Sequence, residues 1–108
     1  PYTMRLAVAQ IGQVNWELIQ PLEGPSIYKE FLEKHGEGVH HLAFAVDDYD
    51  QAVAALEKQG MGILMGGTYR GGTYAYMDTE KAVGTVVEIY KRPPGHRPAP
   101  PEAMYPPS

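Results

Sequence analysis

Three residues with metal-binding side chains stand in the middle of three segments whose composition is typical of β-strands. Glu17 lies within residues 14–20, His41 within 39–46 and Glu88 within 84–91. Side chains along a strand alternate between its two faces, and each of the three lies on the face opposite the bulkier apolar residues. A buried carboxylate is costly unless it is paired or bound to a metal. Two carboxylates beside an imidazole therefore favour a bound divalent cation. A set of one nitrogen and two oxygen ligands is suitable for Zn, Co, Ni, Mn or Mg.

The residues alone leave a simpler interpretation open. A glutamate in a strand often lies on a solvated sheet face, and a histidine in a strand is often structural. The same alternation predicts which faces pack: Leu42 and Phe44 should lie beneath helices, and His40 should share their face. In the preceding strand, Trp16 and Leu18 belong to the bulky apolar face.

The elements that would position these residues follow from periodicity and from turn-forming residues. Ser26 and Asp48 are suitable N-caps for two helices, which should end near His35 and at Gly60. Strands are predicted at 3–11, 14–20, 39–46, 61–65, 73–78 and 84–91, with turns at Gly66–Gly67 and 70–72 and a polar loop at 79–83.

This order predicts an α+β fold with one domain over residues 1–91. Residues 38–91 form a complete βαβββ unit, and 1–37 correspond to the second half of another unit, without its opening strand and helix. Residues 92–108 are rich in proline, which is incompatible with a helix or a central strand. We expect this tail to be a flexible terminus, the alternative being an arm that lies over a partner subunit.

Composition excludes several classes of function. The chain has 108 residues, a net charge of −4 and no cysteine. Disulfides and thiolate metal sites are therefore excluded, and the scattered basic residues do not predict nucleic-acid binding. No apolar run has the roughly 20 residues of a membrane span, and no signal pattern opens the chain, so we expect no membrane association and a cytoplasmic location.

Four segments resemble methylmalonyl-CoA epimerases. They are WELIQPLEG at 16–24, FLEK at 31–34, GEGVHHLAFAVDD at 36–48 and GTVVEI at 84–89. The third is the most specific of the four, and all fall in the order expected for these proteins. The wider group is the vicinal-oxygen-chelate superfamily, which includes glyoxalases such as lactoylglutathione lyase.

The resemblance implies paired βαβββ units that form a curved mixed sheet, usually in a homodimer. It also implies one divalent metal ion with four ligands: Glu17, His41, Glu88 and a fourth on a strand upstream of Pro1. Members use the metal to hold two neighbouring oxygens of a small-molecule substrate and to stabilise an enediolate or enolate. The implied activity is that of a lyase or isomerase that moves a proton next to a carbonyl, with Glu88 or Glu17 as the base.

One departure concerns the substrate. Epimerases usually have "HPK" where this chain has Asp-Thr-Glu at 78–80, which weakens the case for a CoA ester. Arg70 and Tyr74 are alternative substrate contacts, although Arg70 would equally suit a solvated turn.

Two other activities of the same superfamily are alternatives. A metal-free binding protein of the bleomycin-resistance type would use an aromatic surface, for which the candidates are Trp16, Tyr69, Tyr74, Tyr76 and Tyr90. Otherwise Trp16 is expected in the core and the tyrosines are ordinary strand residues. An extradiol dioxygenase would need a second histidine ligand, and we expect no spare histidine on a matching strand.

Overall fold

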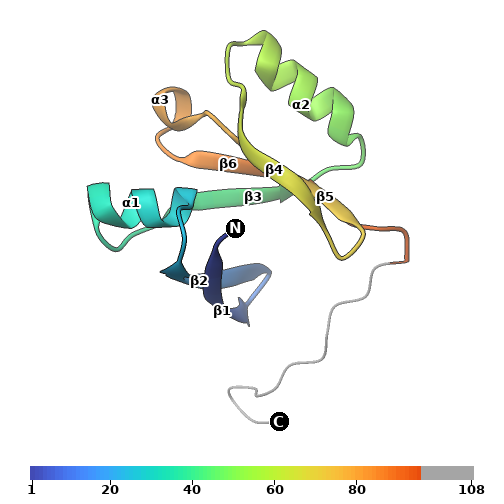
Figure 1. The fold of residues 1–108 in the computed structure, drawn as a ribbon. Helices are drawn as coiled ribbons and strands as arrows, with labels where there is room; N and C mark the ends of the chain where they lie inside the picture. The colour runs from blue at the N-terminus through green and yellow to red at the C-terminus, as the bar shows by residue number, and fades with distance from the viewer. Residues whose placement is uncertain (96–108) are drawn as a thin grey trace. The chain divides into compact units, whose positions relative to one another are not determined.

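The computed structural model describes residues 1–95, which form two compact bodies that are interleaved in sequence. We call residues 1–42 with 79–87 the hairpin body, and residues 43–78 with 88–95 the sheet body. The elements (Figure 1) are β1 Thr3–Ile11, β2 Val14–Glu23, α1 Ile27–His35, β3 His41–Ala45, α2 Tyr49–Lys58, β4 Ile63–Tyr69, β5 Gly72–Met77, α3 Glu80–Val83 and β6 Val86–Lys91. The proline-rich tail prediction falls mostly on residues 96–108, outside the described part.

The hairpin body is built on the antiparallel pair of β1 and β2. Ile11 pairs with Val14, and Gly12 has φ 64° in the turn between the strands. We predicted that Pro21 would end the second strand, which was wrong, because β2 continues to Glu23. Pro21 pairs with Met4 next to an irregularity in register. Each strand of a two-stranded sheet has an unpaired edge, where a residue without an N–H is tolerated.

Helix α1 follows this hairpin with the predicted start and end. The Ser26 hydroxyl accepts a hydrogen bond from the Lys29 N–H at 3.1 Å, as an N-cap does. Gly36 follows the last turn with φ 77°, a backbone conformation that favours glycine, and its N–H donates to the Leu32 carbonyl. Tyr28 is the buried residue of the helix.

The sheet body carries most of a four-stranded sheet with the order β3-β6-β5-β4, in which β3 and β6 begin in the hairpin body. Strand β3 is shorter than the predicted 39–46. Helix α2 begins at the predicted cap, where Asp48 accepts from the Gln51 N–H at 3.0 Å. Helix α3 lies where we expected a polar loop. Its four residues are too few to show a periodic pattern in the sequence.

Strand β4 differs most from its prediction. We expected a strand at 61–65 and a turn at Gly66–Gly67, but β4 runs through both glycines. A Cβ on Gly66 would lie 2.8 Å from the Tyr74 carbonyl oxygen, so this glycine allows two backbones to approach closely. The turn to β5 lies at Arg70 and Gly71, with φ 51° and 82°, within the turn predicted at 70–72. Two consecutive positive φ values are the signature of a type I′ hairpin turn.

On two strands, β2 and β3, the apolar side chains that we predicted to be buried are largely exposed. Leu42 and Phe44 were expected beneath helices, yet about half of each is exposed. Helix α2 instead contacts β5, whose Ala75, Tyr76 and Met77 are buried. Trp16, expected in the core, is 51% exposed, and Leu18 is 66% exposed. Alternation identifies the apolar face of a strand, but another element must be available to cover it.

Within residues 1–95, no helix has the combination of length and hydropathy that crossing a bilayer requires.

Candidate functional site

Two of the three predicted metal ligands meet in the hairpin body. Glu17 lies on β2 opposite Val8 of β1, and His41 is the first residue of β3. The Nε2 atom of His41 lies 4.0 Å from Oε1 of Glu17. The His41 side chain is 9% exposed and the Glu17 side chain is 41% exposed. The pair therefore joins a largely buried imidazole to a carboxylate that a small molecule can reach.

The chemistry of this pair fits a divalent cation. Zinc binds imidazole nitrogen and carboxylate oxygen at roughly 2.0–2.2 Å, so two such ligands of one tetrahedral ion lie about 3.4 Å apart. The 4.0 Å between the two side chains is longer than this, so the two atoms would move together by about half an ångström to hold a zinc ion. One nitrogen and one oxygen make half of a four-ligand site.

The third predicted ligand, Glu88, lies on β6 and belongs to the sheet body. Its side chain is partly buried, and two other residues of the same strand, Val86 and Ile89, are buried. Over residues 1–95, the structure assembles no group of three histidine, aspartate or glutamate residues suited to a metal ion. The three-residue ligand set, with Glu17 or Glu88 as the base, stays a prediction.

His40 contacts His41, contrary to the sequence prediction. We expected His40 to point to the opposite face, but the two Nδ1 atoms are 2.9 Å apart. The reason is local: β3 begins only at His41, so the alternation of a strand does not constrain His40. The two rings are nearly perpendicular, with centroids 5.1 Å apart and an interplanar angle of 86°.

Helix α1 supplies the aromatic surroundings of His40. The centroid of the His40 ring lies 5.3 Å from that of Tyr28 and 5.1 Å from that of Phe31, both in edge-to-face geometry. Edge-to-face contacts at these distances are favourable for aromatic rings. The helix thereby limits how the imidazole can rotate.

Hydrogen bonds from two threonines hold the backbone next to the histidines. The Thr85 hydroxyl donates to the His40 carbonyl at 3.3 Å. Thr79, only 2% exposed, donates its hydroxyl hydrogen to the Thr85 carbonyl and accepts from the Val87 N–H, both at 2.8 Å. Sequence reasoning did not identify this network, because Thr79 stood in a segment interpreted as a polar loop.

The two predicted substrate contacts lie in the sheet body. Arg70 is in the β4–β5 turn, with its guanidinium 5.5 Å from the centroid of the Tyr69 ring. Tyr74 lies on β5, partly buried, and its ring is edge-to-face with Tyr76 at 5.9 Å. Tyr76 itself is 4% exposed, so it does not belong to an aromatic binding surface. The role of Arg70 and Tyr74 in substrate binding stays a prediction.

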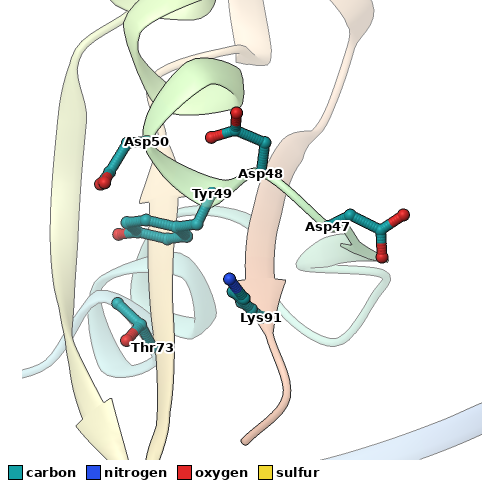
Figure 2. A pocket seen from close by; sticks show the side chains of 6 residues that line it. All are labelled: Asp47, Asp48, Tyr49, Asp50, Thr73 and Lys91. Atoms are coloured by element: carbon teal, nitrogen blue, oxygen red, sulfur yellow. The ribbon is translucent and has the colours of Figure 1, made fainter. Parts of the chain in front are cut away.

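A shallow hollow that the sequence did not predict lies at the start of α2. It has a volume of about 540 Å³, and its lining, shown in Figure 2, consists of Asp47, Asp48, Tyr49, Asp50, Thr73 and Lys91. Burial raises the pKa of the Tyr49 phenol, and the negative charges of Asp50 and Glu57 raise it further. The Asp48 carboxylate already caps the helix. Of these aspartates, we had interpreted Asp48 as a helix-capping residue.

Comparison with known proteins places this geometry in context. A family model described as Glyoxalase/Bleomycin resistance protein/Dioxygenase superfamily matches residues 1–77. An uncharacterized protein of Bacillus subtilis (strain 168), YqjC, is 32% identical over 89 residues, which are 80% of this chain and 64% of that relative. The chain thus spans less than two thirds of that relative's length.

Solved structures show the same fold. The hypothetical protein BH1468 from Bacillus halodurans C-125 has a TM-score of 0.71 at 24% identity, over 88% of this chain and 71% of that one. A variant methylmalonyl-CoA epimerase of Streptomyces coelicolor, in complex with 2-nitronate-propionyl-CoA, has a TM-score of 0.71 at 23% identity, over 88% and 72%. The Mycobacterium tuberculosis methylmalonyl-CoA epimerase has a TM-score of 0.68 at 24% identity, over 84% and 64%. The predicted α+β, glyoxalase-like fold is confirmed.

Proposed function

The chain belongs to the Glyoxalase/Bleomycin resistance protein/Dioxygenase superfamily, and from that premise we propose that it is a metal-dependent lyase or isomerase that moves a proton next to a carbonyl. The observation that carries the proposal is the Glu17–His41 pair, with its side-chain atoms 4.0 Å apart. A nearly buried imidazole beside a carboxylate is an arrangement suited to holding a cation and accepting a proton.

One divalent ion, Zn, Co, Ni, Mn or Mg, would be held by Glu17, His41 and Glu88. When bound, such an ion supplies a Lewis acid that polarises a carbonyl oxygen and so acidifies the hydrogen on the adjacent carbon. His41 is the fixed member of this set, because its side chain is 9% exposed.

Glu17 is suited to the proton transfer because its side chain is 41% exposed. A carboxylate that is in contact with solvent can reach a substrate hydrogen without first being uncovered. Glu88, partly buried on β6, is the alternative base. In both cases the carboxylate takes the proton from carbon and returns it to the same or a neighbouring atom.

The proposed substrate class is a small carbonyl compound with an acidic hydrogen on the adjacent carbon. Epimerase structures with the same fold were determined with 2-nitronate-propionyl-CoA and with methylmalonyl-CoA, and the second of these is a thioester with such a hydrogen. Arg70 and Tyr74 would contact the remainder of the substrate. We further propose that the protein acts as a homodimer, as is usual in the superfamily.

Metal content tests the proposal directly. The 108-residue chain, purified without a metal-chelate column, would be analysed for elements, together with His41→Ala and Glu17→Gln. We expect close to one divalent ion per chain in the parent protein and clear losses in both variants. Glu33→Gln is the matched control, because it makes the same chemical change on the exposed side of α1.

A parent protein that remains without metal after reconstitution would contradict the proposal. It would favour the metal-free binding protein of the bleomycin-resistance type instead. Metal retained in full by His41→Ala would also contradict it, since the ion would then be bound elsewhere.

A further inference from the structure

The two faces of the sheet in the sheet body can be assigned from its contacts with α2. The hollow at the start of this helix is lined by Thr73 of β5 and Lys91 of β6, so both side chains lie on the face that α2 covers (Figure 2). Side chains alternate along a strand. Tyr74 on β5, with Glu88 and Tyr90 on β6, therefore project from the opposite face. That face carries Glu88, the alternative candidate base.

Strand β4 leads to an arginine on the same face. Gly67 pairs with Tyr74, and a Cβ on Gly67 would lie 3.5 Å from the Tyr74 hydroxyl, so these two residues share a face. Tyr69 lies two residues further along β4 and belongs to that face too. The Arg70 guanidinium is 5.5 Å from the centroid of the Tyr69 ring. Contact with an aromatic ring is favourable for a cation and restrains where the guanidinium lies.

A second arginine lies at the same end of the sheet. Nη2 of Arg92 donates to the Tyr90 hydroxyl at 3.0 Å, and the guanidinium carbon lies 5.3 Å from the centroid of the Tyr90 ring. The chain after Arg92 packs on the β4–β5 turn, where a Cβ on Gly71 would lie 3.4 Å from Cβ of Pro93. Each arginine thus contacts a tyrosine of the face opposite α2, and all of these residues belong to the sheet body.

No carboxylate of the described chain neutralises these two cations. Over residues 1–95, neither Arg70 nor Arg92 forms an ion pair with an aspartate or a glutamate. The whole chain has a net charge of −4, so the pair is not part of a generally basic protein. Arginine is also unusual at position 70, because a type I′ turn with φ 51° at this position favours Asn, Asp or Gly. An unfavourable backbone conformation is retained most often where the side chain has a function.

We propose that Arg70 and Arg92 together bind an anionic group of the substrate, a carboxylate or a phosphate. A guanidinium presents five N–H donors in a plane that matches either group. Arg92 donates one of them to Tyr90, which leaves the others for an anion. Arg92 follows Glu88 by four positions, or about 13 Å of extended chain. The charged group of the substrate therefore lies several bonds away from its acidic hydrogen, a statement that rests on the proposed function, whereas the anion site does not.

Binding of two simple anions tests the site without any reaction. The 108-residue chain, Arg70→Gln and Arg92→Gln would be titrated with inorganic phosphate and, separately, with succinate. The Nε–H signals of the arginines in ¹H–¹⁵N NMR spectra report binding at each side chain, and the backbone signals report the fold of each variant. Lys91→Gln is the matched control, because Lys91 adjoins Arg92 in sequence but lies on the α2 face.

We expect the signals of both Arg70 and Arg92 to shift with at least one anion, and the anion that binds more tightly identifies the group. Each arginine variant should weaken that binding by about two- to fivefold, as for exposed ion pairs, and Lys91→Gln should leave it unchanged. Equal binding in the parent and both arginine variants would overturn the proposal. So would the absence of any shift, or a loss in Lys91→Gln as large as in Arg92→Gln.

Kinetics with methylmalonyl-CoA, which carries a carboxylate and phosphates, test whether the site serves the substrate. KM for exchange of the acidic hydrogen should rise in Arg70→Gln and Arg92→Gln with kcat nearly unchanged, because the arginines contact a part of the substrate remote from the reacting carbon. A parental KM in both variants would overturn the assignment to the substrate. A parent protein that binds the anion through both arginines but catalyses no exchange would contradict the proposed function and support the anion site.

Discussion

The hairpin body and the sheet body differ in where they place apolar side chains. In the sheet body, Ala75 and Met77 on β5 are fully buried and Ile89 on β6 is nearly so. In the hairpin body, Leu18 and Val14 on β2 are both at least 60% exposed. The hairpin body nevertheless contains the Glu17–His41 pair and the buried Thr79 network. The strand residues of this body are thus less buried, and we infer that hydrogen bonds and ring contacts help to maintain the geometry of the pair.

The largest effect is expected from the carboxylate of the hairpin body. Glu17→Gln removes both a ligand and the candidate base, and loss of a general base typically costs about 10²–10⁴-fold in rate. The rate is measured with branched acyl thioesters as substrates, by following with NMR how fast their acidic hydrogen exchanges with deuterated solvent. Glu33→Gln should exchange at the parental rate. Exchange that persists in Glu17→Gln would shift the role of base to Glu88, and exchange that persists in both Glu17→Gln and Glu88→Gln would contradict a carboxylate base.

Truncation of one apolar residue in each body compares the two cores. Met77→Ala should lower the free energy of unfolding by about 2–5 kcal/mol, because Met77 is 0% exposed and the surrounding residues cannot fully close the cavity. Leu18→Ala removes a side chain that is 66% exposed and should cost well under about 1 kcal/mol. Urea unfolding followed by circular dichroism measures both. Equal losses would show that the exposed face of β2 is covered in solution, as in a dimer.

The polar network of the hairpin body can be tested by Thr79→Val. This change keeps the shape but leaves the Val87 N–H and the Thr85 carbonyl without the hydroxyl that bonds both at 2.8 Å. An unsatisfied buried polar group costs about 1–3 kcal/mol, which urea unfolding can resolve. Thr68→Val, on the exposed part of β4, is the control and should be nearly neutral. A neutral Thr79→Val would mean that the network does not stabilise this body.

The smallest effect concerns Tyr49 in the sheet body. Burial, then Asp50 and Glu57, raise the pKa of its phenol above the ordinary value near 10. The folded protein therefore holds this proton more tightly than the unfolded chain. The resulting stability is fully present below about pH 10 and is lost as the pH rises through the raised pKa. The loss of unfolding free energy between pH 8 and pH 11 should be smaller in Tyr49→Phe than in the parent, and an identical loss would contradict the raised pKa.

Much of the local structure could be predicted from the sequence. Strand β1 and helix α1 have the predicted ends, and Ser26 and Asp48 form the predicted caps, because capping and periodicity depend on near neighbours in the chain. The glyoxalase-like fold followed from the motifs at 16–24 and 36–48. The incorrect predictions concern positions where a backbone segment distant in sequence determines the local structure. Strand β4 passes through Gly66 because β5 approaches it, and β2 continues past Pro21 at an unpaired edge.

The sequence by itself determined which residue types are available for chemistry and on which strands they lie, since residue identity and alternation are properties of the chain. Only the tertiary structure decided that Glu17 and His41 come within 4.0 Å of each other and that His40 bonds His41. It also decided that Leu42 and Phe44 remain half exposed while β5 is covered. The physical reason is that a side chain's burial and its hydrogen-bond partner depend on which distant element packs against it, and alternation along one strand does not specify that element.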